Sequence, residues 1–176
     1  MLLDPRAILL FASNAILLYL MLLVNSALAS WSIYLCLLGP MVVFPALYLR
    51  HRSYLICTMI SGLWVDAALP APFGLFTICF LFVGAFIFQM RIRFRAEHNY
   101  HPILLAHSLN FFYLVVLAIF LGNGSWGSVA YWMQVVVTSL ASHLVLLMIA
   151  PWFFNFERML FTVFRMDTEP EDFPIL

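Results

Sequence analysis

Long apolar runs recur along this chain and limit the class of fold that it can adopt. Residues 7–28 contain no charged side chain, and comparable runs follow one another until about residue 154. A helix of about 20 apolar residues crosses the roughly 30 Å of hydrocarbon in a bilayer. Because 65% of the residues are apolar and only 9% are charged, too little polar surface remains to cover a water-soluble globule. We therefore predict an all-α integral membrane protein.

Six such runs predict six transmembrane helices in a single domain, residues 1–154. Their approximate ranges are 7–28, 31–49, 53–69, 73–89, 102–121 and 129–154. Pro40 and Pro45 interrupt the second run. Since proline removes a backbone donor and clashes with the preceding turn, we expect that helix to be kinked.

A change of pattern after residue 154 predicts a separate C-terminal segment, residues 155–176. Glu157 and Arg158 lie on one face of a possible helix, and apolar residues recur on the other. These apolar residues are Phe156, Met159, Leu160, Val163 and Phe164. The pattern is typical of an amphipathic helix lying in the membrane interface. The acidic, proline-containing run 167–172 that follows is expected to be disordered.

All eight basic residues are arginines, and six transmembrane helices would place them on one side of the membrane. They are Arg6, Arg50, Arg52, Arg91, Arg93, Arg95, Arg158 and Arg165. Because positive residues are retained in cytoplasmic loops, we expect both termini to be cytoplasmic. The run Arg91-Ile-Arg93-Phe-Arg95 has two possible roles, which are contact with lipid phosphates and contact with a cytoplasmic protein partner.

The stretch from Ser61 to Gly74 is the most specific part of the sequence. It contains Asp66, the only ionised side chain between Arg52 and Arg91. A carboxylate within or at the edge of a bilayer needs a hydrogen-bonding partner or a wet pocket. Three roles remain open for Asp66. It could accept N–H groups from the turn at residues 70–74, contact a partner protein, or relay a proton or ion.

Four further polar residues within the apolar runs are candidates for a buried cluster. They are Asn14, His107, Asn110 and His143. Similar depths in the membrane predict interhelical hydrogen bonds among them, with a ligand or proton site as the alternative. The spacings of cysteine, histidine and acidic residues match no metal site or catalytic set, so we predict no metal, no cofactor, no nucleic-acid binding and no enzymatic activity.

The pattern Gly62-Leu63-x-x-Asp66, followed by a turn containing Pro72 and then by Phe73-Gly74, resembles the signature of the bacterial rod shape-determining MreD family. A proline and a basic turn, Pro45 and residues 50–52, precede it at a spacing like that of the family. The resemblance covers roughly residues 1–154, although only the central stretch is specific. It implies structural or partner-binding roles for Gly62, Asp66, Pro72 and Gly74.

The resemblance also implies a function. MreD proteins are non-enzymatic scaffolds of the elongasome in the bacterial inner membrane, where lateral peptidoglycan synthesis maintains rod cell shape. They associate with the single-span protein MreC and, through it, with MreB, RodA and a class B penicillin-binding protein. The double proline at positions 70 and 72 and the long acidic tail depart from many members of the family.

The family fold is thought to be like that of the S components of energy-coupling-factor transporters, and a vitamin-binding S component is therefore the alternative. Those proteins dock their transport module through an Ala-x-x-x-Ala pattern in the first transmembrane helix. Ala7, Ala12 and Ala15 do not form that pattern. The sequence therefore favours the MreD-like scaffold.

Overall fold

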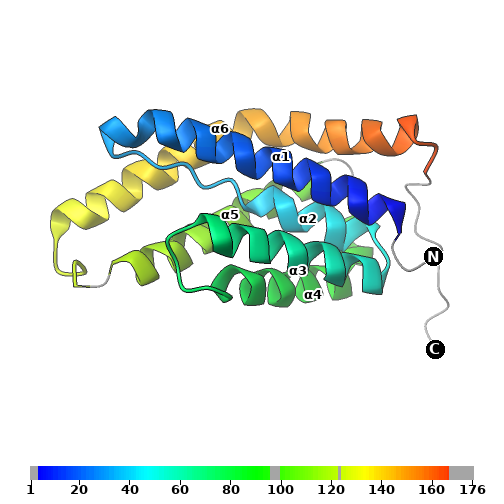
Figure 1. Cartoon of the computed structure of the whole chain (residues 1–176), viewed down its shortest axis with the longest axis horizontal. Coiled ribbons are helices and arrows are strands. Elements are labelled where there is room, and N and C mark those ends of the chain that lie inside the picture. Colours follow the sequence, from blue (N-terminus) through cyan, green and yellow to red (C-terminus); the bar gives the residue numbers. More distant parts are fainter. Residues whose placement is uncertain (1–3, 96–99, 123, 167–176) are drawn as a thin grey trace.

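The computed structural model describes residues 4–95, 100–122 and 124–166, and for residues 92–95, 100 and 101 it describes the backbone alone. Within these ranges the chain is helical and contains no strand (Figure 1). The elements are α1 (Pro5–Leu28), the 3-10 turn η1 (Ala29–Trp31), α2 (Gly39–Tyr48), α3 (His51–Ala68), α4 (Leu75–Arg95), α5 (Tyr100–Leu121) and α6 (Val129–Val163). The predicted all-α fold is confirmed for the described residues.

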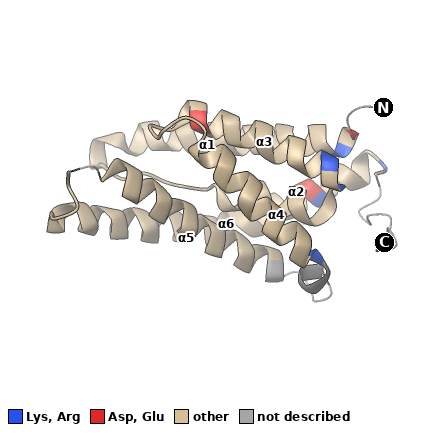
Figure 2. Ribbon diagram, turned by 90° about the horizontal axis from the view of Figure 1, so that it is seen from below, with Lys and Arg blue, Asp and Glu red and all other residues tan. Residues whose placement is uncertain are grey.

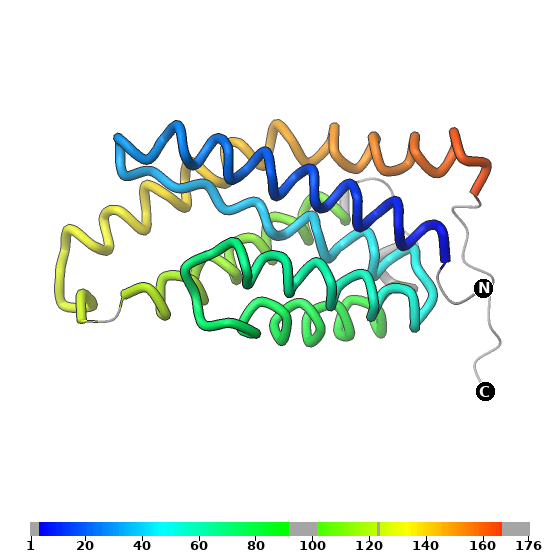
Figure 3. Tube along the Cα trace, in the orientation of Figure 1, coloured from blue at the N-terminus to red at the C-terminus, as the bar shows by residue number. Residues whose placement is uncertain are grey.

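Three of these helices are long and apolar enough to cross a membrane. They cover Pro5–Trp31, Pro102–Leu121 and Val129–Val163. The helices form an elongated bundle in which α1 begins and α6 ends at the same end (Figures 1 and 3). Large apolar side chains also cover much of the outer surface, including Phe82 and Met148. These features identify a membrane protein.

The described basic residues gather at one end of the bundle, which we call the arginine end (Figure 2). Arg6 follows the start of α1, Arg50 precedes α3, and Arg158 lies near the end of α6. The α3–α4 turn lies at the opposite end, which we call the turn end. Charge is therefore segregated along the bundle axis, as the sequence pattern predicted.

The second apolar run is not a continuous kinked helix. Residues 33–38 have no regular secondary structure, and α2 begins only at Gly39. Pro40 occupies the first turn of α2, where a missing N–H costs nothing because that donor has no partner within the helix. The predicted helix over residues 31–49 is therefore an extended segment followed by a ten-residue helix.

Residues 35–38 of the extended segment are buried, so their backbone needs hydrogen-bonding partners. Side chains of α1, α5 and α6 provide them. Asn25 accepts from the Leu35 N–H at 2.6 Å and donates to the Leu35 carbonyl at 2.9 Å. The Ser142 hydroxyl accepts from the Cys36 N–H at 3.0 Å, and Met21 Sδ accepts from the Leu37 N–H at 3.3 Å. Asn110 Oδ1 accepts from the Leu38 N–H at 3.1 Å and from the Gly39 N–H at 3.4 Å. Four side chains from three helices therefore hold the break in place.

No boundary separates residue 154 from residue 155. α6 continues without a break to Val163, so the predicted division into segments 1–154 and 155–176 does not correspond to separate helices. Glu157 was predicted on the polar face and is instead buried with Phe161, whereas Met159 and Val163 of the predicted apolar face are exposed. Apolar residues lie on both faces here, and packing against α2 rather than polarity selects the buried one. The predicted disordered tail lies outside the described residues.

Candidate functional site

The hairpin of α3 and α4 contains all four residues of the predicted structural site. Asp66 lies in the last turn of α3, and its side chain is only 4% exposed. Its Oδ1 accepts the Phe76 N–H at 2.8 Å, and its Oδ2 accepts the Thr77 N–H at 3.0 Å and the Thr77 hydroxyl at 2.5 Å. The carboxylate therefore binds the first turn of the next helix.

This geometry explains why an acidic residue lies near the carboxyl end of α3. The first N–H groups of a helix have no partner within it, and the helix dipole places partial positive charge there. Asp66 supplies the missing acceptor to α4 from another helix. The predicted donors in the turn at residues 70–74 are replaced by Phe76 and Thr77, which follow that turn. Because both carboxylate oxygens are occupied, the contacts favour a structural role for Asp66 over a relay of protons or ions.

Gly62 allows α3 and α4 to approach closely. A Cβ atom at this position would lie 2.6 Å from the Thr77 Cα, a separation that real side chains do not adopt. Since the neighbouring atom belongs to the backbone, the helices would have to move apart. Gly62 and Asp66 are one turn apart on α3 and both contact Thr77. The two residues therefore act together to fix the hairpin.

The other two predicted residues shape the turn itself. Gly74 has φ +95°, a left-handed conformation that residues with a side chain rarely adopt. The Pro72 carbonyl accepts the Leu75 N–H at 3.1 Å. Pro72 and Phe73 are exposed, and the Phe73 side chain is 73% accessible. The turn therefore presents an apolar ring at the turn end of the bundle.

The histidines and asparagines do not form one cluster. The rings of His107 and His143 stack with centroids 5.5 Å apart, and His143 Nε2 lies 3.3 Å from the His107 carbonyl oxygen. Asn110 binds the backbone at the start of α2 instead. Asn14 donates to the Met41 carbonyl at 2.9 Å. The structure thus pairs the histidines and separates both asparagines from them.

The predicted arginine cluster can be described only in part. The Arg91 guanidinium carbon lies 4.3 Å from the centroid of the Phe88 ring, a cation–π contact within one helix. The side chains of Arg93 and Arg95 lie outside the described residues.

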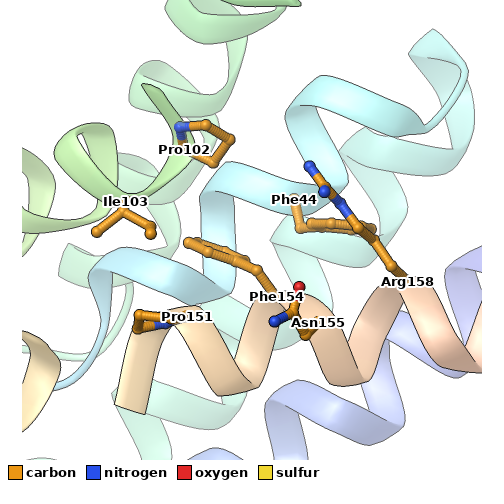
Figure 4. A pocket seen from close by; sticks show the side chains of 7 residues that line it. All are labelled: Phe44, Pro102, Ile103, Pro151, Phe154, Asn155 and Arg158. Atoms are coloured by element: carbon orange, nitrogen blue, oxygen red, sulfur yellow. The ribbon is translucent and has the colours of Figure 1, made fainter. Parts of the chain in front are cut away.

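Two cavities lie at opposite ends of the bundle. A cavity of about 140 Å³ at the arginine end is lined by Phe44, Pro102, Ile103, Pro151, Phe154, Asn155 and Arg158 (Figure 4). A larger one, about 450 Å³, lies at the turn end between α1, α3, α5 and α6. Most of its wall is apolar, with Asn25, Tyr34, Tyr131, Gln134 and Thr138 as polar lining residues. Gln134 donates to the Ser32 carbonyl at 3.0 Å, so part of this polar lining is already engaged within the protein.

Glu157, Ser142 and Asn25 have buried or backbone-binding roles that the sequence pattern did not predict. Glu157 had the same signal that singled out Asp66, since it is the only acidic residue between Glu97 and Asp167. Because Glu157 lies in a segment with an amphipathic pattern, it was predicted on the polar face of that helix rather than in the core. Ser142 and Asn25 carry no such signal, because their partners are backbone atoms distant in sequence.

Comparisons with protein-family models, with curated proteins and with solved structures find no match for this chain. Among the described residues, no group of three or more histidine, cysteine or acidic side chains could hold a metal ion.

Proposed function

We propose that this protein is a membrane scaffold that resembles MreD and helps to organise lateral peptidoglycan synthesis with a single-span partner of the MreC type. The observation that carries the proposal is the construction of the α3–α4 hairpin. Residues of the family-like pattern form one unit, in which Gly62 and Asp66 hold two helices together and the turn between those helices exposes Pro72 and Phe73. A rigid, exposed turn of this kind suits recognition of another protein.

We propose six crossings of a bacterial inner membrane, with both ends of the chain in the cytoplasm. α2 alone spans about 15 Å at 1.5 Å per residue, too little for a bilayer. Residues 33–38 add up to about 20 Å at about 3.3 Å per extended residue, so the broken segment as a whole is long enough. The arginine end would then face the cytoplasm, where anionic lipids attract guanidinium groups.

Co-purification with an MreC-type partner tests the scaffold. We expect Phe73→Ala to reduce the amount of partner recovered while leaving thermal unfolding unchanged, because the ring is exposed and contributes little to the fold. Asp66→Ala should reduce both the amount of partner recovered and the thermal stability, since it leaves the first turn of α4 without its acceptor. Phe82→Ala is the matched control, as this ring is also exposed but lies midway along α4.

In a rod-shaped host that depends on the protein, the same variants should alter cell shape in the same order. Full partner recovery and normal rods with both Phe73→Ala and Asp66→Ala would contradict the proposal. Indirect association with MreB, RodA and a class B penicillin-binding protein would follow from binding to MreC, and it is proposed on that basis alone.

A second candidate is the vitamin-binding S component of an energy-coupling-factor transporter. The cavity of about 450 Å³ at the turn end favours it, because a volume of that size could enclose a small ligand. A thermal-shift screen against vitamins distinguishes the two functions. Strong stabilisation by one vitamin would replace the scaffold proposal, whereas no shift would leave the scaffold as the preferred function.

A further inference from the structure

A second buried carboxyl group lies near the arginine end. Glu157 projects from α6 into the bundle core and is 0% exposed. The helix packs there against α2, where the Phe44 and Phe161 rings have centroids 5.7 Å apart. Helix α1 supplies the hydrogen-bonding partner of Glu157, because Ser13 Oγ lies 3.0 Å from Glu157 Oε1.

The Ser13 hydroxyl cannot donate a hydrogen bond to both of the oxygen atoms that it contacts. Its Oγ lies 2.9 Å from the Leu10 carbonyl oxygen as well as 3.0 Å from Glu157 Oε1. A serine hydroxyl has one hydrogen, whereas a carbonyl and an ionised carboxylate are both acceptors. One of the two contacts therefore lacks a proton unless the carboxyl group supplies it.

The remaining groups around Glu157 do not supply the missing donor. Among the described residues, Glu157 Oε2 has no hydrogen-bonding partner. Asn14, which follows Ser13 in α1, donates its amide N–H groups to the Met41 carbonyl and to the Ser61 hydroxyl at 3.2 Å. Its Oδ1 is likewise buried without a partner. An ionised carboxylate without adequate donors is strongly disfavoured in such surroundings.

Helices α1, α2 and α3 present few titratable or charged groups to the part of α6 that contains Glu157. α3 presents Cys57, a buried thiol close enough for its charge and that of Glu157 to interact. On α2, the Tyr48 hydroxyl accepts from Nη2 of Arg158, the residue that follows Glu157, at 3.4 Å. Near Glu157, α1 presents Ser13 and Asn14, which do not titrate. No described cation forms an ion pair with Glu157.

We propose that Glu157 is a proton-binding site whose carboxyl group is protonated at neutral pH in the folded protein. The carboxylate takes one proton from water and forms an O–H bond at Oε1. That group donates to Ser13 Oγ, and the Ser13 hydroxyl then donates to the Leu10 carbonyl. The bound proton thereby completes a hydrogen-bonded chain from α6 to α1. This inference is independent of the proposed scaffold function.

Infrared difference spectroscopy of the purified full-length protein tests the site. The spectrum of the wild type minus that of Glu157→Gln at neutral pH should contain the carbonyl stretch of a protonated carboxylic acid. A difference spectrum that contains only carboxylate bands would overturn the proposal. Ser13→Ala should move the carbonyl band, because it removes the acceptor of the carboxyl proton, and an unmoved band would overturn the proposed hydrogen bond.

A second measurement needs no variant and therefore does not depend on the folding of one. Apolar carbodiimides react with protonated carboxyl groups, so treatment of the wild type in detergent, followed by peptide mass spectrometry, should modify Glu157 in preference to Asp66. Modification of Asp66 with none at Glu157 would contradict the proposal.

Discussion

Asp66 and Glu157, the two buried carboxyl groups among the described residues, have opposite hydrogen-bonding environments. Asp66, at the turn end, accepts three hydrogen bonds from Phe76 and Thr77. Within the part of the chain that the structure describes, Glu157 at the arginine end has one hydrogen-bonding partner, the Ser13 hydroxyl, which also contacts the Leu10 carbonyl. Both are acidic residues isolated in sequence within apolar runs. Their surroundings, rather than their residue type, therefore determine what each group does.

This difference follows from the helix termini. Asp66 faces the start of α4, where N–H groups without intrahelical partners are concentrated. Glu157 lies within α6 and faces the interior of α1, where the backbone N–H groups are already used. A buried acid opposite a helix start can serve as an acceptor. One opposite the middle of a helix has few donors and is better accommodated with a proton.

Removal of the Asp66 carboxylate should give the largest effect. Asp66→Ala leaves two backbone N–H groups and one hydroxyl without an acceptor, so we expect a loss of about 3–5 kcal/mol in unfolding free energy. Thr77→Val removes only the hydroxyl donor and should cost about 1–2 kcal/mol. Unfolding in mixed micelles measures both. A loss from Asp66→Ala no larger than that from Thr77→Val would show that the backbone bonds contribute little.

Asn110 extends the comparison to a neutral acceptor. Its Oδ1 serves the N–H groups of Leu38 and Gly39 where α2 begins. Asn110→Ala should therefore cost about 2–4 kcal/mol, since two buried donors lose their partner. Phe111→Ala, at an exposed neighbouring position, is the control and should change stability by about 0.5 kcal/mol or less. Equal losses of stability from Asn110→Ala and Phe111→Ala would show that Asn110 does not stabilise the backbone at the start of α2.

The close approach that brings Asp66 to α4 can be tested at Gly62. Gly62→Ala should destabilise the protein by about 1–3 kcal/mol, because the added methyl group meets the Thr77 backbone. Gly84 is the matched control, since a Cβ there would make ordinary contacts, the nearest at 3.5 Å from the Tyr54 ring. Gly84→Ala should leave stability unchanged or raise it by up to about 1 kcal/mol through helix propensity. Equal losses at both positions would exclude the steric explanation.

The sequence predicted the elements that local rules govern. Apolar run length gave the helical membrane class, and the isolation of Asp66 beside a glycine and a proline turn indicated a specified hairpin. The break before Pro40 was not predictable, because the groups that stabilise it, Asn110 and Ser142, lie far away in sequence. The burial of Glu157 was missed because Glu157 and Arg158 together look like the polar side of an amphipathic helix, whereas the packed side is set by contacts with helices distant in sequence.

The most direct test of the account is a comparison of the two carboxyl-to-amide variants at neutral pH. Asp66→Asn turns an amide donor toward N–H groups and should lower the unfolding free energy by about 2 kcal/mol. Glu157→Gln replaces a protonated acid with a neutral group of similar shape and should change it by less than about 1 kcal/mol. Equal losses, or a larger loss from Glu157→Gln, would contradict the different roles assigned to the two carboxyl groups.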